Sequence, residues 1–110
     1  QFSLLFIDID QADQDTVVDF FKNVDADLNL YFYNGENNVP WLFYALARSD
    51  YTFINIDNMS AITSYISGYI LSKQGVFYKC QDINITEIYN HINLNKVNNI
   101  KDFLEKVYSD

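Results

Sequence analysis

Residues 2–24 read FSLLFIDIDQADQDTVVDFFKNV and contain the change of pattern that decides the fold. The first part, residues 2–9, is almost entirely apolar or β-favouring, as in a strand that is buried on both faces. From Asp13 onward the apolar residues recur at helical spacing, and Asp13 and Asp15 stand near the positive end of that helix. The stretch therefore predicts a buried strand followed directly by an amphipathic helix.

The same alternation continues to the end of the chain. Further β-favouring runs predict strands over 28–33, 51–56 and 76–80, and helical patterns follow each of them. The polar turn 34–38 offers Gly35 for a positive φ, and a helix over 39–47 follows with Asn38 as its cap and Pro40 in its first turn.

Capping residues also locate the later helices. Ser60 caps a predicted helix over 61–72, in which Ile62, Tyr65, Ile66, Tyr69 and Ile70 keep a helical spacing, and Gly75 ends it. A short helix is expected over 85–92, and Asn99 caps a last one over 100–107.

The predicted order is β-α-β-α-β-α-β-α-α, which is typical of a parallel sheet covered by helices on both faces. We expect one α/β domain over residues 1–110, Rossmann-like or flavodoxin-like. Its doubly wound sheet should have four parallel strands in the order 2-1-3-4.

The charge is strongly negative and unevenly placed. Fifteen Asp and Glu against seven Lys and Arg give a net charge of −8, and residues 1–30 contain seven Asp against the single cation Lys22. Such a field disfavours direct binding to nucleic acid or to anionic membrane surfaces. It leaves a basic protein partner, or an acidic surface that serves solubility.

Composition gives an expected location. The longest apolar stretches are far shorter than the roughly 20 residues of a membrane span, no leader pattern is recognisable, and the single cysteine, Cys80, permits no internal disulfide. We therefore expect a cytoplasmic protein without membrane contact. The many Asn and Ile residues indicate an AT-rich genome, such as that of a low-GC bacterium or a phage, in which case the location is the host cytoplasm.

Polar residues follow each predicted strand. The carboxyl ends of parallel strands share one edge, and ligands usually bind there, at the point between the first and third strands where the strand order reverses. The candidate ligand-binding residues at this edge are Asp8, Asp10, Asn34, Asp57, Asn58 and Ser60.

Asp8-Ile9-Asp10, at the end of the first predicted strand, is a D-x-D motif. On an extended strand its carboxylates would lie on one side about 7 Å apart, as in the Mg²⁺-binding motif of haloacid dehalogenase phosphatases. Those enzymes also need a lysine and further acids, and the alternative is a solvated strand end. Residues 10–15, DQADQD, contain no glycine-rich phosphate loop, so we expect no nucleotide cofactor and no bound metal.

Two other residue types could be catalytic or structural. Cys80 and His91 could form a nucleophilic pair, or they are a core thiol and a surface imidazole. Asn58 and Asn84 stand in glycosylation tripeptides, but we interpret both as helix caps.

Residues 49–80, SDYTFINIDNMSAITSYISGYILSKQGVFYKC, carry a family resemblance. The segment resembles the centre of the nucleoside 2-deoxyribosyltransferase-like family, in which a strand ends in Asp and a capped helix carries Gly-Tyr. Asp57 would be the strand-end acid, Ser60 the cap, and Gly68-Tyr69 the Gly-Tyr pair. The nucleophilic glutamate of that family lies two residues before the glycine, where this chain has Ile66.

This departure shapes the alternative function. An isoleucine cannot accept a glycosyl group, so the resemblance implies lost activity and a scaffold that could still hold a nucleoside-sized ligand. The alternative is a nucleoside- or nucleotide-processing enzyme, similar to a deoxyribosyltransferase or N-glycosidase. Asp8, Asp10 and Asp57 would then be its acids, and Asn34, Asn58 and Ser60 would orient sugar hydroxyls.

The predicted helix 39–47 is apolar around nearly its whole circumference, although covering a sheet needs only one apolar stripe. Its outer side is either covered by neighbouring helices or forms a contact surface that includes Trp41, Phe43 and Tyr44. We expect a non-catalytic protein-binding or accessory domain that self-associates or docks on a larger protein partner.

Overall fold

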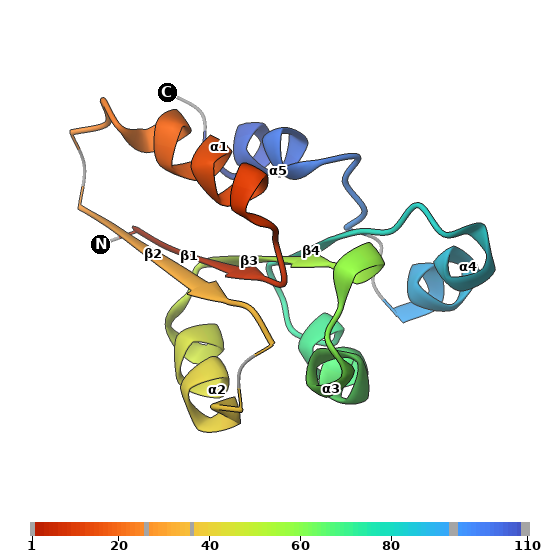
Figure 1. Cartoon of the computed structure of the whole chain (residues 1–110). Helices are drawn as coiled ribbons and strands as arrows, with labels where there is room; N and C mark the ends of the chain where they lie inside the picture. Colours follow the sequence, from red (N-terminus) through yellow and green to blue (C-terminus); the bar gives the residue numbers. More distant parts are fainter. Residues whose placement is uncertain (1, 26, 36, 93–94, 109–110) are drawn as a thin grey trace.

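The computed structural model describes residues 2–25, 27–35, 37–92 and 95–108, and it confirms the α/β fold (Figure 1). Glu36, in the predicted turn 34–38, lies outside the described residues. The strands are β1 (Phe2–Ile7), β2 (Leu28–Tyr33), β3 (Tyr51–Asn55) and β4 (Val76–Lys79). The helices are α1 (Gln11–Phe21), α2 (Val39–Arg48), the 3-10 helix η1 (Ile56–Asn58), α3 (Ala61–Leu71), α4 (Ile83–Ile92) and α5 (Ile100–Val107).

The strands form one parallel sheet in the predicted order β2-β1-β3-β4. β1 is central: Phe6 pairs with Phe32 of β2 on one side and with Phe53 of β3 on the other. A central strand contacts protein on both faces, which explains why residues 4–7 are fully buried and apolar.

Helices cover both faces of the sheet, as Figure 1 shows. Leu5, Ile7 and Ile54 belong to the core beneath α2 and α3. The alternate residues Phe6 and Phe53 belong to the core beneath α1 and α5, because successive side chains of a strand point to opposite faces. The two helical layers therefore have separate cores and separate outer surfaces.

The capping predictions are mostly confirmed. Asn38, Ser60 and Asn99 each accept a hydrogen bond from a backbone N–H in the first turn of the following helix. The predicted caps at Asn58 and Asn84 are wrong. The amide of Asn58 donates to the backbone oxygen of Asp8, and Asn84 lies inside α4 with its N–H donating to Asp82 at 2.9 Å.

A short parallel contact extends the sheet beyond β4. Tyr78 bridges to Lys96; its N–H donates to the oxygen of Asn95 at 3.0 Å, and its own oxygen accepts from Val97 at 2.9 Å. The sequence had placed two helices in direct succession here. A bridge of one residue pair produces no apolar run that could have predicted it.

Candidate functional site

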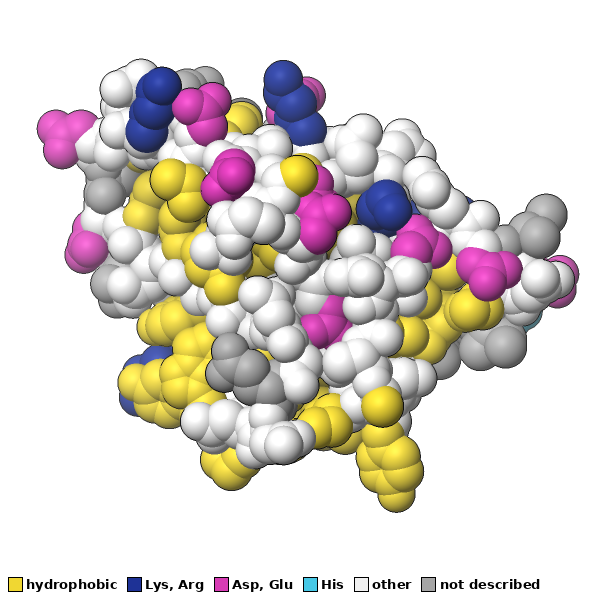
Figure 2. Space-filling view, viewed as in Figure 1, with side chains coloured by type: hydrophobic (Ala, Val, Ile, Leu, Met, Phe, Trp, Pro, Cys, Tyr) yellow, Lys and Arg dark blue, Asp and Glu magenta, His cyan; other side chains and the backbone are white. Residues whose placement is uncertain are grey.

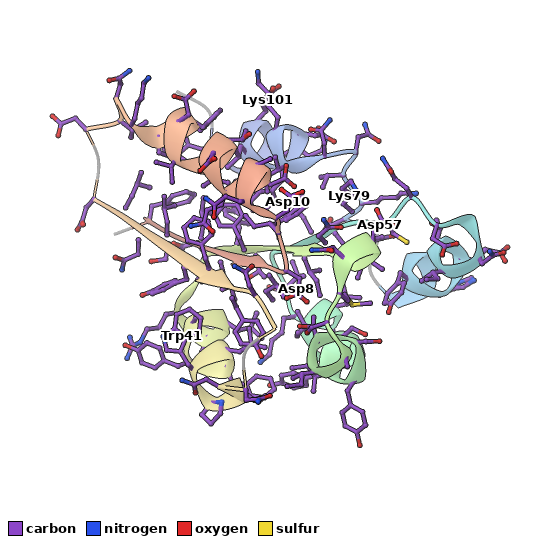
Figure 3. The ribbon with its side chains drawn as sticks, in the orientation of Figure 1. Asp8, Asp10, Trp41, Asp57, Lys79 and Lys101 are labelled. Atoms are coloured by element: carbon purple, nitrogen blue, oxygen red, sulfur yellow. The ribbon has the colours of Figure 1, made fainter. Side chains whose placement is uncertain are left out.

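Asp8 connects three elements at the carboxyl edge of the sheet (Figure 3). Its N–H donates to the oxygen of Tyr33 at the end of β2 at 2.7 Å. Its carboxylate accepts the N–H of Ser60 at 2.9 Å, and its backbone oxygen accepts from Asn58 at 2.9 Å. Asp8 is buried, and its negative charge lies against the N-terminus of α3, where the helix dipole favours it. Asp8 thus joins the end of β1 to the end of β2 through its backbone N–H, to η1 through its backbone oxygen and to the start of α3 through its carboxylate.

The D-x-D geometry expected from the sequence is wrong. β1 ends at Ile7 because Asp8 adopts a φ of 59°, so Asp8 and Asp10 do not continue an extended chain. Asp10 instead caps α1 and accepts the N–H of Asp13 at 2.8 Å. The solvated strand end, the alternative interpretation, is also wrong for Asp8 because this residue is buried.

The loop after β2 closes over Asp8. Gly35 has a φ of +68°, and a Cβ atom at this position would lie 2.6 Å from Cβ of Ser60. With its amide oriented to satisfy both partners, Asn34 donates to the backbone oxygens of Tyr33 at 3.2 Å and Ile9 at 3.1 Å. Four of the six predicted ligand-binding residues therefore come together, and their hydrogen bonds connect the ends of β1 and β2 with η1 and the start of α3: Asp8, Asn34, Asn58 and Ser60.

Asp57 lies at the same edge and forms an ion pair with Lys79 at 2.8 Å (Figure 3). The N–H groups of Gln81 and Asp82 also donate to its carboxylate. Burial alone would raise the pKa of Asp57, but the hydrogen bonds from Lys79 and Gln81 outweigh it and lower the pKa below its ordinary value. Asp57 therefore stays ionised at neutral pH and joins the ends of β3 and β4.

Lys79 lies at the same edge of the sheet and was not among the predicted site residues. It comes from the end of β4 and reaches across to Asp57. The pKa of Asp13 is raised above its ordinary value by burial and by the negative charge of Asp10. The positive charge of Lys79 offsets part of this rise. Among the residues that the structure describes, no three His, Cys, Asp or Glu side chains gather as they would around a metal ion.

A hollow of about 380 Å³ lies beside the end of β4. It is lined by Cys80, Gln81, Thr86, Lys96, Val97 and Asn98. The thiol of Cys80 is buried and accepts the hydroxyl of Thr86 at 3.4 Å, which confirms the predicted core thiol. His91 is exposed on α4.

α3 has an unusual division between its inner and outer sides. The inner side buries Thr63, Ser67, Ile70 and Leu71, whereas Tyr65 is 92% exposed and Tyr69 52% exposed. Thr63 and Ser67 are satisfied locally, the hydroxyl of Thr63 by Ser60 at 2.9 Å and that of Ser67 by the backbone of Ser64 at 2.9 Å. Two small hydroxyl residues therefore share the inner side with Ile70 and Leu71, while two tyrosines face outward. The apolar spacing of this helix thus includes both buried and exposed residues.

The predicted contact residues of α2 occupy three different places. Trp41 stacks on Tyr33 with ring centroids 6.4 Å apart, beside the edge strand β2. Phe43 meets Tyr69 of α3 edge-on at 5.4 Å. Tyr44 is half exposed, with the guanidinium of Arg48 above its ring.

We call the outer side of α2 and α3 the tyrosine face. Its members are Val39, Phe43, Tyr44, Ala61, Ile62, Tyr65, Ile66, Gly68 and Tyr69. A groove of about 310 Å³ runs along it between the two helices, lined by Val39, Ala61, Ile62, Tyr65 and Ile66. Ile66, the residue that the sequence resemblance aligns with a nucleophilic glutamate, is thus part of an apolar groove.

The tyrosine face has no acidic side chain, and two cations lie over its rings: Arg48 is 4.4 Å from the ring centre of Tyr44, and Lys73, just after α3, is 4.9 Å from that of Tyr69. Arg48 is the one charged residue in α2 and α3 together, whereas α1 contains three Asp and α5 four charged residues. Figure 2 shows the acidic side chains above and beside the sheet, and apolar ones over α2 and α3 below it. In the described part of the chain, no helix combines the length and the apolar character needed to cross a bilayer.

Comparisons of this chain with protein-family models, with curated proteins and with solved structures find no match.

Proposed function

We propose that this chain is a non-catalytic protein-interaction domain that docks on its partner through the tyrosine face. The observation that carries the proposal is the combination of an apolar groove with Tyr65, which is 92% exposed beside it. Aromatic side chains are enriched at the energetic centres of protein interfaces, and charged residues are depleted there. The tyrosine face has exposed aromatic side chains and no acidic side chain.

The energetic argument concerns the surface left in water. A tyrosine side chain buries about 150–250 Å² when covered, so Tyr65 alone keeps an area of that order exposed. Covering such a ring gives a gross gain of about 1.5–3 kcal/mol, part of which offsets the cost of association. Nothing in the fold requires Tyr65 at this position, because the inner side of α3 supplies the packing against the sheet. A contact with another molecule accounts for it.

The edge of the sheet supports a role without catalysis. The carboxylates of Asp8, Asp10 and Asp57 each accept backbone N–H groups, and Asp57 also holds Lys79. A carboxylate that acts as a general acid or binds a metal ion must give up such hydrogen bonds. Here this would remove the bonds that connect neighbouring strand ends. The alternative nucleoside-processing function therefore has less support.

The proposal is tested with a photo-crosslinking amino acid placed at position 65 of the full chain, in the cells that make it. Position 18 is the matched control, because Val18 is 52% exposed but lies on α1, in the opposite layer. We expect a protein adduct from position 65 and none from position 18. Equal adducts from both positions, or none from position 65, would contradict the proposal.

A further inference from the structure

We propose that the outer edge of β2 binds an extended segment of a protein partner, in which apolar or β-branched residues are flanked by Lys or Arg. The segment adds to the sheet as a further strand beside β2. This is a second contact surface, separate from the tyrosine face, and it does not rest on the proposed function. Three properties of the chain support it: the unprotected edge, the direction of its backbone groups, and the acidic residues at its flanks.

The two edges of the sheet are protected differently. β4 has four residues, ends in the charged Lys79, and is covered by the bridge between Tyr78 and Lys96. β2 has six residues, no charge and no proline, and it pairs with β1 in one unbroken register (Figure 1). Charge, proline, bulges and covering segments are the usual means by which edge strands avoid pairing with other chains. The described part of the chain places no strand on the outer side of β2, so this edge is open to an added one.

The backbone of β2 directs every second residue outward. The N–H of Phe2 donates to the oxygen of Asp27 at 2.9 Å, so the odd-numbered residues of the strand turn their backbone groups toward β1. The even-numbered residues therefore direct their N–H and C=O groups away from β1; they are Leu28, Leu30 and Phe32. An added strand can bond to these groups, which is how many domains bind extended peptides.

The side chains of β2 are only partly covered by the fold. Residues 28–32 all keep some exposure, whereas residues 4–7 of the central strand keep none. Leu30 lies on the side of α1 and α5, and Tyr31 lies on the other side, edge-on to Trp41 at 6.1 Å. An added strand would place alternate side chains beside both, and apolar, aromatic or β-branched residues pair best at such positions. We therefore expect these residue types in the middle of the partner segment.

Acidic residues flank β2 in the sequence. The segments 23–27 and 34–38 contain Asp25, Asp27 and Glu36 and no Lys or Arg. Both Asp25 and Asp27 are exposed, directly before the strand begins. Lys or Arg at the ends of an added segment would therefore meet opposite charge, which favours association and selects basic partners.

Charge also separates this partner from a second copy of the chain. Two β2 strands in antiparallel contact would bring the flank 23–27 of one copy beside the flank 34–38 of the other, so like charges would meet at both ends. The net charge of −8 on each copy adds to the repulsion. A basic segment meets attraction at the same places.

The experiment titrates the purified full chain with a synthetic peptide in which Val and Thr alternate over about six residues between terminal lysines. NMR of the backbone amides follows binding. We expect a dissociation constant of about 10–100 µM, and the amide hydrogens of Leu30 and Phe32 should exchange at least about tenfold more slowly with peptide bound. The amides of Asn29 and Tyr31, which face β1, should change little. A peptide with glutamates in place of the lysines should bind at least about tenfold more weakly.

Variants of the chain separate the backbone contribution from the charge contribution. Leu30→Pro removes an outward N–H but no bond to β1, and it should weaken binding at least about tenfold; Leu30→Ala keeps that N–H and should change binding less than about threefold. Asp27→Lys should weaken binding of the lysine peptide about three- to tenfold and strengthen that of the glutamate peptide. Glu105→Lys on α5 is the matched charge control and should change neither. Circular dichroism checks folding, and Asp27→Lys keeps the test decisive if Leu30→Pro does not fold.

The proposal is wrong if amide shifts are confined to α2 and α3, if the lysine and glutamate peptides bind equally, or if neither binds below about 1 mM. Slowed exchange at Leu30 that grows with chain concentration in the absence of peptide would identify a second copy as the occupant and would also overturn it. Tyr65→Ser should leave peptide binding unchanged, so failure at the β2 edge leaves the proposed function of the tyrosine face intact.

Discussion

Asp8 is the residue on which the carboxyl edge of the sheet depends. Its left-handed φ of 59° is tolerated better by Asp and Asn than by most other residues. Its carboxylate, at the start of α3, satisfies a backbone N–H that would otherwise be buried without a partner. A single side chain thus combines an uncommon backbone conformation with a charge-assisted hydrogen bond.

Replacing Asp8 tests this interpretation. We expect Asp8→Ala to lower the free energy of unfolding by about 2–3 kcal/mol, because it leaves the N–H of Ser60 without its acceptor. Asp8→Asn should cost about 1 kcal/mol, since an amide oxygen still accepts and asparagine tolerates the same φ. Urea unfolding measures both, and equal losses for the two variants would show that the hydrogen bond contributes little.

The ion pair of Asp57 and Lys79 predicts a dependence on pH. The pKa of Asp57 is lowered from 3.8 in the folded chain, so its contribution to stability is complete above that value and is lost as pH falls through the folded pKa. We expect Asp57→Asn to lower the free energy of unfolding by about 1–2 kcal/mol near pH 7, and the difference from the unmodified chain to shrink below about pH 4.

Asp19→Asn is the control for that measurement. Asp19 pairs with Lys22 at 3.1 Å, but both side chains are mostly exposed. Exposed pairs contribute little, so the change should stay within about 0.5 kcal/mol. A constant difference between Asp57→Asn and the unmodified chain across this pH range would contradict the role assigned to the carboxylate.

At the scale of elements, the junction between the β2–α2 loop and α3 is the tightest contact at the edge of the sheet. We expect Gly35→Ala to lower the free energy of unfolding by about 2 kcal/mol, because alanine is strained at a φ of +68° and its Cβ would lie 2.6 Å from that of Ser60. In a Ser60→Gly background the steric part should vanish and about 1 kcal/mol should remain. Thermal unfolding of the unmodified chain, the two single variants and the double variant measures the coupling free energy between the two positions. Strictly additive losses of stability would contradict a direct contact.

The strands and caps could be predicted because their signals are local. A buried central strand needs an unbroken apolar run, and a helix start needs an Asn or Ser that can accept an N–H, so residues 2–9, Asn38, Ser60 and Asn99 were informative. The orientation of α3 could not be predicted in this way. Its inner side combines Ile70 with Thr63 and Ser67, whose hydroxyls find hydrogen-bond partners in the folded chain, so apolar spacing alone did not separate the buried side from the exposed one.

The sequence predicted which residues meet at the edge of the sheet, but not which atoms their side chains bond to. Parallel topology brings the strand ends together, and Asp8, Asn34 and Ser60 do meet there. Which atoms their side chains bond to depends on the turn at Asp8 and on Lys79, which reaches Asp57 from a strand that comes later in the chain. Sequence spacing contains neither fact.

At the scale of the whole molecule, the sheet separates two different surfaces. α1 and α5 together carry seven charged side chains, and the layer of α2 and α3 carries the groove, the exposed tyrosines and no acidic residue (Figure 2). Like charges on an acidic surface repel other acidic molecules, whereas a surface without acids does not. In the proposed function, the first surface remains in solvent and the second contacts the partner.

The last prediction concerns activity. Glycosyl transfer through a covalent intermediate needs a nucleophile at the anomeric carbon, and Ile66, which lines the apolar groove, has neither a charge nor a lone pair to offer. Asp8 and Asp57 are held by Ser60 and Lys79, and releasing either would open a joint of the sheet. We therefore expect no free base above background when the purified chain is incubated with nucleosides and nucleoside monophosphates and the products are separated by chromatography. Turnover that disappears in Asp57→Asn or Asp8→Asn would contradict the interaction-domain interpretation, because it would show that these carboxylates leave their structural bonds to act on a substrate.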